Sequence, residues 1–378
     1  METKPVKLLY DKTGLIVEVP ADAAILQGKD IPPISNPVDA IIKALDNPIG
    51  TEPLRQLVRR RKPSSVAITV SDITRPVPNK VFLPPMLDIL NSAGVDDSQI
   101  VIVIGTGMHR PSTAEEREII LGNEILSRVE VIDHEANKPE TLIEISDDPP
   151  VRVNRRFAQA EFHIVTGYIE PHFMAGFSGG RKGVCPALVD LATIERFHGY
   201  QTLADKRADA GVLDGNPCHE IALQIARKVG VDFLFNVAIT RERQIAGIYC
   251  GDLEQAHLAG CRDVARWTSA EVDETFDLVI TSAGGYPLDA TFYQSVKGMC
   301  GSLPILRNDS TLIIVAGCSE GLGEKAYADL LLSSSLNTRW REFLDRIAMP
   351  GTFLPFQWDL QMRTRVLERI GAEKIWFV

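Results

Sequence analysis

The sequence contains no pair of cysteines in the C-x-x-C spacing, which argues against a zinc knuckle or a disulfide framework. We expect free, buried thiols instead, because an unpaired cysteine behaves as a small hydrophobic side chain. The cysteines are Cys185, Cys218, Cys250, Cys261, Cys300 and Cys318. The chain also lacks an apolar run near the roughly 20 residues of a membrane helix. Its first residues, METKPVKLLYDKTG, contain no hydrophobic signal core. These absences predict a cytoplasmic protein.

Positive charge is in deficit, with 40 Lys and Arg against 50 Asp and Glu and a net charge of -10. This balance argues against an extended nucleic-acid surface, so a small anion would have to be bound by a few well-placed cations. The remaining composition, 45% hydrophobic and 24% charged over 378 residues, is typical of a globular protein with two or three domains.

Short runs rich in valine and isoleucine recur along the chain, and each is followed by a polar or glycine-containing loop. The runs are residues 64–70, 99–105, 161–169, 276–282 and 310–316. Such runs are typical of buried parallel strands. Helical patterns lie between them, at residues 112–122 and at 218–230, where Gly230 marks the end. A capping box could join Ser112 to Glu115 or Thr113 to Glu116.

The alternation of strands and helices predicts an α/β fold of two domains, with mainly parallel sheets flanked by helices. We place the boundary in a charged turn near residues 267–276. The N-terminal α/β domain then spans 1–268, and a smaller C-terminal α/β domain spans 269–378. Because ligands bind beyond the carboxyl ends of parallel strands, we expect the polar loops to converge on an active site in the cleft between the domains.

Two strand-end loops carry candidate polar groups. The first, SDITRPVPN, offers Asp72 and Arg75, which fit equally well a solvated turn with an ion pair and a site for a carboxylate. The second, GTGMHRPS, begins like a dinucleotide fingerprint but has Arg110 in place of the third glycine. Its histidine, His109, is either a general acid or base or a ring bonded to nearby backbone.

The most informative segment is PHFMAGFSGGRKG, residues 171–183. Glycines here would allow backbone to approach a phosphate or cofactor closely. The segment is not a Walker A loop, because Arg181 stands where the second glycine belongs and Gly183 follows the lysine. His172 and Lys182 within it, and His198 beyond it, are candidates for a base, a nucleophile or a metal ligand. Packing or capping is the alternative for His198.

A later loop, residues 284–298, leads from a strand into a helix that carries Tyr293, Gln294 and Lys297. Gln294 and Lys297 are three residues apart and so share a helix face, where they could hold an anionic oxygen or simply face solvent. Trp358, in QWDLQ, is more typical of a core residue than of a ligand contact. Four further histidines have no telling neighbours and are expected to be structural or on the surface: His134, His163, His219 and His257.

Taken together, these motifs resemble the nickel-dependent lactate racemase family. The resemblance runs in collinear order from about residue 60 to 365, through SDITRPVPN, GTGMHRP, HFMAGFSGGRKG, RFHG, GGYP-x-D-x-x-x-YQ-x-x-KG and QW. It implies a racemase or epimerase of a 2-hydroxy acid that uses a nickel-pincer nucleotide. The implied partners are the small substrate and the proteins that make the cofactor, without nucleic acid or membrane.

The resemblance also implies a role for each matching residue. Lys182 would be the attachment lysine, and His198 the nickel ligand. His109 and His172 would be the paired acid/base groups. The remaining matches would hold the substrate carboxylate or shape the pocket around cofactor and substrate: Arg75, Gln294 and Lys297 for the carboxylate, and Asp72, Tyr293, Ser295 and Trp358 for the pocket.

The segment Leu288–Phe292 departs from the family's more usual residues beside the substrate clamp, which leaves the particular acid open among lactate, malate, phenyllactate, 2-hydroxyglutarate and a sugar acid. Two other functions compete with a racemase. One is a non-catalytic protein that binds an organic acid or a nucleotide on the same scaffold. The other is an NAD-dependent dehydrogenase, against which the incomplete glycine fingerprint argues.

Overall fold

A computed structural model describes residues 2–333 and 336–378. Within it the chain divides into two compact units. The larger unit comprises residues 28–197 and 211–269, and the smaller comprises residues up to 27, 198–210 and 270–378. The observed division at Ser269–Ala270 adjoins the expected boundary, but residues up to 27 and 198–210 cluster with the C-terminal part of the chain.

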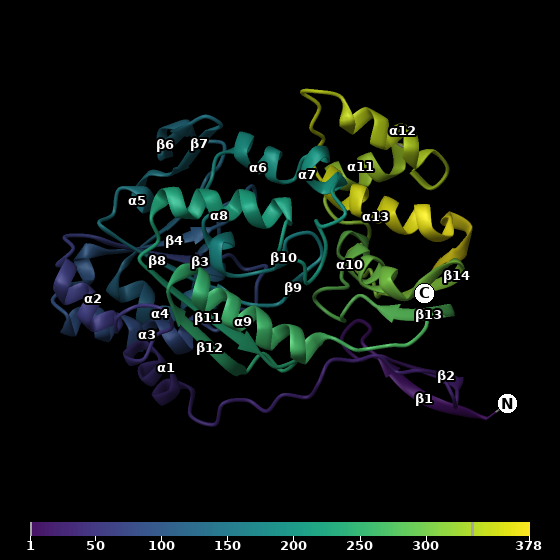
Figure 1. Ribbon diagram of the computed structural model, residues 1–378, viewed down its shortest axis with the longest axis horizontal. Coiled ribbons are helices and arrows are strands. Elements are labelled where there is room, and N and C mark those ends of the chain that lie inside the picture. Colours follow the sequence, from purple (N-terminus) through teal and green to yellow (C-terminus); the bar gives the residue numbers. More distant parts are fainter. Residues whose placement is uncertain (1, 334–335) are drawn as a thin grey trace. The chain divides into compact units, whose positions relative to one another are not determined.

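The larger unit is built on a six-stranded sheet of order β12-β11-β8-β3-β4-β5 (Figure 1). All neighbouring strands are parallel except β12, which is antiparallel to β11. The strands are β3 (Val66–Ser71), β4 (Ile100–Gly105), β5 (Glu130–Asp133), β8 (Phe162–Tyr168), β11 (Phe233–Ile239) and β12 (Ile245–Gly251). The expected strands at residues 64–70, 99–105 and 161–169 are confirmed as β3, β4 and β8.

Helices flank this sheet. Residues of α1 (Pro37–Asp46), α2 (Leu54–Arg61), α3 (Asn79–Ser92) and α4 (Ala114–Arg128) share one buried apolar cluster with alternate residues of the central strands. A second cluster joins β12 to α9 (Leu253–Thr268). Also in this unit are α5 (Arg155–Ala158), α6 (Leu191–Phe197) and α8 (Pro217–Val229). Two hairpins complete it, β6 (Leu142–Asp147) with β7 (Pro150–Asn154) and β9 (Pro171–His172) with β10 (Gly176–Phe177).

Helix ends follow the local sequence signals. Thr113 and Glu116 form the capping box that begins α4, which selects one of the two expected pairings. At α8, the Asn216 side chain accepts hydrogen bonds from two backbone N–H groups at the start. The same helix ends at Gly230, whose φ of 83° is a left-handed conformation that suits glycine.

The smaller unit contains a parallel three-stranded sheet of order β13-β14-β15, made of Phe276–Ser282, Leu306–Val315 and Ile375–Phe377. Its helices are α7 (Tyr200–Ala204), α10 (Phe292–Ser302), α11 (Lys325–Ser333), α12 (Leu336–Ala348) and α13 (Gln357–Ile370). A hairpin of β1 (Thr3–Leu8) and β2 (Leu15–Pro20) also belongs to it. The α/β class and the mainly parallel strand pairing expected from the sequence are confirmed.

Segment 198–210 joins the smaller unit because α13 binds it through backbone carbonyls. The Arg365 guanidinium donates hydrogen bonds to the carbonyl oxygens of Leu203, Asp205 and Ala208, at 2.7, 2.9 and 3.0 Å. Gln361 Nε2 donates to the carbonyl oxygen of Tyr200 at 3.0 Å. These contacts span about 160 residues of chain, so no local pattern could have indicated them.

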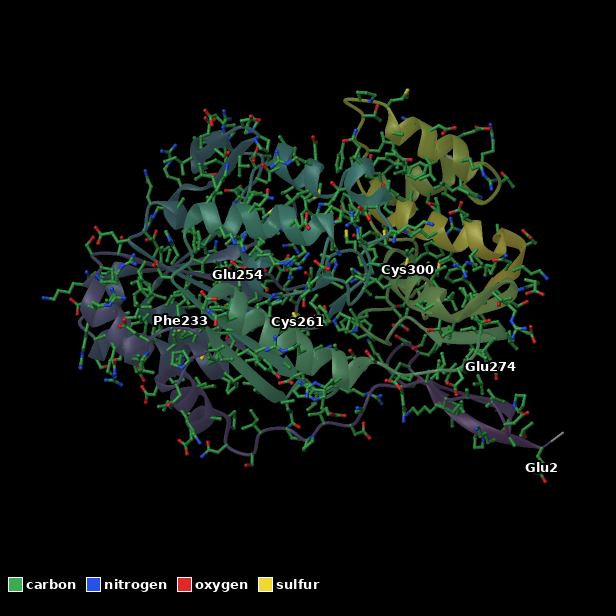
Figure 2. All side chains as sticks on the ribbon, viewed as in Figure 1. Glu2, Phe233, Glu254, Cys261, Glu274 and Cys300 are labelled. Carbon is green, nitrogen blue, oxygen red and sulfur yellow. The ribbon has the colours of Figure 1, made fainter. Side chains whose placement is uncertain are left out.

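All six cysteines are free, as expected; five are buried and Cys318 is half-buried. Figure 2 labels Cys261 on α9 and Cys300 on α10. Burial raises the pKa of the Cys261 thiol to about 12, so it stays protonated at neutral pH. None of the helices in the described part of the chain combines the length and apolar character needed to cross a bilayer.

Candidate active site

Neighbouring strands of the larger unit place Asp72 and His109 together. β3 and β4 pair in parallel with Ser71 opposite Gly105, so the loops after them begin side by side. Nδ1 of His109 lies 2.7 Å from Oδ2 of Asp72. The Asp72 carboxylate is buried, whereas about half of the His109 side chain is exposed. The Asp72 carboxylate therefore pairs with His109, and the expected turn is present as well, because the backbone N–H of Arg75 donates to the Asp72 carbonyl oxygen at 3.2 Å.

The environment of Asp72 favours its ionised form. Burial alone would raise the pKa of this carboxyl, but hydrogen bonds from His109 and Thr74 and the charge of Arg75 outweigh burial and hold the pKa below its usual value. An ionised Asp72 accepts a hydrogen bond from the Nδ1–H group of His109. In a neutral His109 ring, Nε2 then carries the lone pair. The pair has the geometry of an imidazole oriented by a carboxylate.

The glycine loop follows β8 by way of the β9–β10 hairpin and ends in a short 3₁₀ turn, Gly180–Gly183. Its glycines are required by packing within the protein. A Cβ on Gly179, where φ is 72°, would lie 2.6 Å from Oδ1 of Asn236. A Cβ on Gly180 would lie 2.5 Å from the His257 ring. Within the protein, Asn236 and His257 therefore approach these two glycines closely, and the expected approach to a phosphate or cofactor stays a prediction.

Arg181 holds the loop from within. Its side chain is 1% exposed and donates hydrogen bonds to the carbonyl oxygens of Phe177 and Ala175 at 2.9 and 2.6 Å. One terminal nitrogen also lies 3.2 Å from Nε2 of His257. Burial lowers the pKa of Arg181 to about 10, so it remains charged at neutral pH. The sequence did not indicate the Arg181–His257 contact, because the two residues are 76 positions apart.

Lys182 is partly buried beside His172. Its Nζ lies 3.4 Å from Nε2 of His172 and 5.2 Å from the centroid of the Phe197 ring. Loss of hydration, followed by the charges of Arg181 and Arg75, lowers the pKa of Lys182 to about 7. A large fraction of the amine is thus uncharged at neutral pH, and an uncharged amine is the nucleophilic form.

Backbone donors orient the His172 ring. Nδ1 of this buried ring accepts from the backbone N–H groups of Met174 and Ala175 at 3.4 and 3.3 Å. Because an accepting Nδ1 carries no proton, neutral His172 bears its proton on Nε2, the atom that faces Lys182. The larger unit thus contains His109 with a free base nitrogen and His172 with a donor nitrogen.

His198 lies in the smaller unit, directly after the end of α6, in agreement with the expected helix end. Its ring centroid lies 4.8 Å from that of Trp358, and Trp358 Nε1 donates to the Tyr293 hydroxyl at 3.2 Å. Two aromatic residues not singled out from the sequence, Phe353 and Phe356, also contact Trp358, with centroid distances of 6.2 and 5.4 Å. The sequence did not indicate that these two residues contact Trp358, because they lie in a segment without a charged motif.

The other candidates of the smaller unit lie on α10. Ser295 is fully buried, and its hydroxyl donates to the Phe292 carbonyl oxygen at 2.6 Å. Oε1 of Gln294 is buried and has no hydrogen-bond partner among the described residues. Burial raises the pKa of Asp359 to about 8, an effect that the Tyr327 hydrogen bond and the charge of Lys297 oppose.

The candidates thus form two groups by unit. The larger unit contains Asp72, Arg75, His109, His172 and Lys182, and the smaller contains His198, Tyr293, Gln294, Ser295, Lys297 and Trp358. Across the described ranges, no group of three or more His, Cys, Asp or Glu side chains could hold a metal ion.

Two further histidines are structural, as expected. Nε2 of His134 lies 2.9 Å from the Val189 carbonyl oxygen, and Nδ1 of His163 lies 2.9 Å from that of Gly230.

Both parts of the chain match models of one protein family. Residues 10–211 match the family model of the lactate racemase N-terminal domain, and residues 272–374 match that of the C-terminal domain. Lactate racemase from Thermoanaerobacterium thermosaccharolyticum is 33% identical over 334 residues, and that from Lactiplantibacillus plantarum is 34% identical over the same length. Each alignment covers 87% of this chain and 77% of the relative.

Solved structures agree with this comparison. The lactate racemase apoprotein from T. thermosaccharolyticum superposes with a TM-score of 0.90 at 31% identity, covering 99% of this chain and 88% of that one. A protein from Thermotoga maritima, at 19% identity and a TM-score of 0.64, shares the fold over 91% of this chain and 84% of its own. The chain therefore belongs to the lactate racemase family and is an isomerase.

Proposed function

We propose that this enzyme interconverts the configurations at C2 of a 2-hydroxy acid, with a nickel-pincer nucleotide attached to Lys182. The acid is lactate or a relative of it such as malate, phenyllactate, 2-hydroxyglutarate or a sugar acid. The observation that carries the proposal is Lys182 itself, an amine with its pKa lowered to about 7 and placed 3.4 Å from a histidine. The relatives named lactate racemase support the reaction class.

The residues present fit the proposed cofactor. An uncharged Lys182 amine is suited to form the thioamide that tethers the nucleotide. His198, packed against Trp358, would be the imidazole ligand to nickel, and the cofactor would bring its own sulfur donors. When bound, the cofactor would supply the hydride-transfer chemistry at C2 of the substrate.

Two histidines divide the proton transfers in this proposal. Asp72 keeps the proton of neutral His109 on Nδ1, which leaves Nε2 to accept the proton of the C2 hydroxyl. In the resting enzyme His172 has the opposite tautomer, fixed by the N–H groups of Met174 and Ala175, so its Nε2–H can donate a hydrogen bond to the substrate oxygen. A racemase must work on both enantiomers, so two acid/base histidines suit the reaction, and each can return only a proton that it has first accepted.

In this proposal the substrate carboxylate is bound by Arg75, Gln294 and Lys297. Gln294 Oε1 accepts no hydrogen bond within the described part of the chain, so it is available to accept one from the substrate hydroxyl, while the amide N–H would be the group that donates to the carboxylate. Tyr293, Ser295 and Trp358 shape the pocket around the substrate. In this proposal Ser295 presents its oxygen lone pairs, because its proton is donated to the Phe292 carbonyl. The proposal includes a cytoplasmic location and supply of the cofactor by its biosynthetic proteins.

A chiral assay on cofactor-loaded enzyme tests the proposal. Loading is first verified by bound nickel and by a mass adduct on the peptide that contains Lys182. Enantiopure lactate, malate, phenyllactate, 2-hydroxyglutarate and gluconate are then incubated separately. Interconversion of one acid, abolished in His109→Ala and in His172→Ala with nickel retained, is the expected result.

A matched control is His163→Gln, because His163 is a buried structural histidine on β8 of the larger unit. It should keep activity if it folds. Full activity in His109→Ala or His172→Ala would overturn the two-histidine mechanism. No interconversion of any acid by verified loaded enzyme would contradict the proposed substrate range, and binding of an acid without turnover would favour the binding-protein alternative.

A further inference from the structure

The 3₁₀ turn Gly180–Gly183, called the lysine turn below, packs on the central strands of the larger unit. Strands β11, β8 and β3 are neighbours in that order. In the register of this sheet Asn236 lies opposite Gly167, and Thr69 lies opposite Val165. Residues two apart along a strand share a face, and so do residues opposite each other. These four positions therefore lie on one face of the sheet.

This face is shaped to receive the lysine turn. A Cβ on Gly183 would lie 2.5 Å from Cγ1 of Val165 and 3.2 Å from Oγ1 of Thr69. A Cβ on Gly167 would lie 3.8 Å from Cα of Gly179, so a longer side chain there would occupy the space of the loop. Glycine on both surfaces thus lets the backbone of the turn approach the strands closely.

Two polar side chains of the same face hold the lysine turn at its two ends. Oδ1 of Asn236 accepts a hydrogen bond from the backbone N–H of Gly180 at 2.7 Å. Nδ2 of Asn236 donates to the Phe235 carbonyl oxygen at 2.9 Å, which orients the amide. At the other end, Oγ1 of Thr69 donates to the carbonyl oxygen of Gly183 at 3.1 Å. Asn236 and Thr69 are at most 1% exposed, so both bonds form away from water, where they are stronger.

The two hydrogen bonds lie on either side of Lys182. Gly180 precedes this lysine by two residues, and Gly183 follows it directly. The Lys182 backbone cannot shift without breaking a buried hydrogen bond and leaving a polar group unsatisfied. From this fixed backbone the side chain places Nζ 3.4 Å from Nε2 of His172 and 5.2 Å from the centroid of the Phe197 ring.

We propose that Asn236 and Thr69 are positioning residues for Lys182, which fix the lysine turn on the sheet and so keep the amine beside His172 and away from bulk water. This inference rests on the proposed function, in which the amine carries the cofactor. An amine held in one place meets its reaction partner in one orientation, and less conformational entropy is lost when the bond forms. The sequence motifs pointed to neither Asn236 nor Thr69.

The pH at which Lys182 becomes reactive reports how well the turn holds it. Loss of hydration is the largest influence on its pKa, which is lowered to about 7. A change that lets the amine reach water should raise the pKa toward the ordinary value of about 10.4. The charged and titratable groups around the amine are His172 on β9, Arg181 in the lysine turn, Arg75 after β3, and the thiols of Cys185 and Cys218.

Thr69→Val tests the inference, because it keeps the shape of the side chain and removes the hydroxyl. Apo protein is acylated at a series of pH values, and peptide mass spectrometry gives the midpoint of the Lys182 profile. The wild-type midpoint should lie at about pH 7. In Thr69→Val it should lie about one pH unit higher, which lowers the neutral fraction at pH 7 about fivefold. Easier access of the reagent changes the plateau rate but not the midpoint.

Thr166→Val is the matched control. Thr166 is a buried threonine of the same sheet, and its hydroxyl donates to the Thr69 carbonyl oxygen at 2.6 Å. Both valine variants lose a buried hydrogen bond of the same kind and should lose similar stability in urea, but only Thr69→Val should move the midpoint. Thr69→Ser keeps the hydroxyl and should retain the wild-type midpoint. Asn236→Ala releases the other end of the turn and should move the midpoint in the same direction as Thr69→Val.

The inference would be overturned if the midpoint stayed at the wild-type value in whichever of Thr69→Val and Asn236→Ala folds, as judged by circular dichroism. It would also be overturned if Thr166→Val moved the midpoint as far. These profiles need no cofactor, so they are independent of loading. A wild type that gained no mass adduct on Lys182 in cells that make the cofactor would contradict the proposed function instead.

Discussion

Oδ2 of Asp72 lies 2.7 Å from Nδ1 of His109, and this contact fixes which ring nitrogen of His109 is free to act. Asp72→Asn keeps the shape of the side chain but removes the charge that holds the proton on Nδ1. We expect kcat of the loaded enzyme to fall about 100-fold, because the ring would populate both tautomers. Nitrogen chemical shifts of His109 should show the loss of the single tautomer.

The control for this prediction is Asp97→Asn, which breaks an ion pair with Arg128 in the larger unit. It should leave kcat nearly unchanged. If Asp72→Asn turned over as fast as Asp97→Asn, the Asp72–His109 contact would have no part in proton transfer.

Lys182 should react with acylating reagents at a lower pH than other lysines. Its pKa of about 7 lies below the ordinary lysine value, so the neutral amine is already abundant at pH 7. The acylation rate of apo protein should rise through pH 7 and then level off. Lys138 is the comparison, because its hydrogen bond to Glu135 raises its pKa. Peptide mass spectrometry at a series of pH values measures both sites, and parallel pH profiles would contradict the assignment.

Removing this amine should stabilise the apo protein. The depressed pKa means that the folded state disfavours the charged form, a penalty that is complete below about pH 7 and disappears as the pH rises toward the unfolded value near 10.4. Lys182→Met should therefore raise the free energy of unfolding by about 1–2 kcal/mol at pH 6, and by less at pH 9. Urea denaturation at the two pH values measures the difference, and an equal gain at both would point to packing instead of charge.

Asp289 should be a stability determinant of the smaller unit. This fully buried side chain accepts hydrogen bonds from the backbone N–H groups of Asp11 and Gly317, at 2.7 and 3.0 Å, and so links three loops. Asp289→Ala leaves both donors without an acceptor and should cost about 2 kcal/mol of unfolding free energy. Asp277→Ala, at an 81% exposed side chain paired with Arg307, should cost less than about 0.5 kcal/mol. Similar losses from the two variants in urea denaturation would show that the Asp289 link is unimportant.

His198→Ala should separate nickel retention from cofactor attachment. If His198 ligates nickel and Lys182 tethers the nucleotide, dialysis against a chelator should remove nickel from the variant much faster than from the wild type. The mass adduct on Lys182 should remain. His219→Ala is the control, as its ring lies in the larger unit near Arg181. Equal nickel loss from wild type and His198→Ala would contradict the ligand role.

Much of the fold was predictable because it depends on local patterns. All five apolar runs are strands, two of them β13 and β14 of the smaller sheet, and the signals at Thr113, Glu116 and Gly230 mark helix ends as expected. Short or less apolar strands such as β5 and β15 gave no such run. The residue types of the candidate site were also recognisable from motifs.

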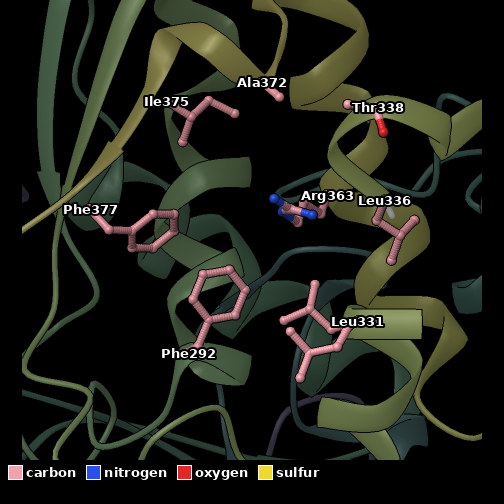
Figure 3. Close-up of a pocket in the computed structure, with 9 residues that line it drawn as sticks. Phe292, Leu331, Leu336, Thr338, Arg363, Ala372, Ile375 and Phe377 are labelled. Carbon is pink, nitrogen blue, oxygen red and sulfur yellow. The ribbon is translucent and has the colours of Figure 1, made fainter. Parts of the chain in front are cut away.

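What the sequence could not reveal are contacts between distant segments. The His109 partner lies 37 residues away, and the Arg181–His257 contact spans 76. The glycines of residues 176–183 showed that something approaches the backbone closely, but they did not show that Asn236 and His257 do so. Phe292, part of the segment that departs from the family, packs on Phe377 at a centroid distance of 4.8 Å and lines a cavity of about 370 Å³ in the smaller unit (Figure 3).

The three carbonyl acceptors of Arg365 bear on how this protein can be divided by cloning. A fragment that begins at residue 270 would contain α13 but lack Leu203, Asp205 and Ala208, and would leave the guanidinium without these acceptors. A fragment that ends at 269 would carry α7 away from the helix that binds it. Co-expression of the two pieces, or a circular permutation that keeps 198–210 beside α13, would preserve these hydrogen bonds.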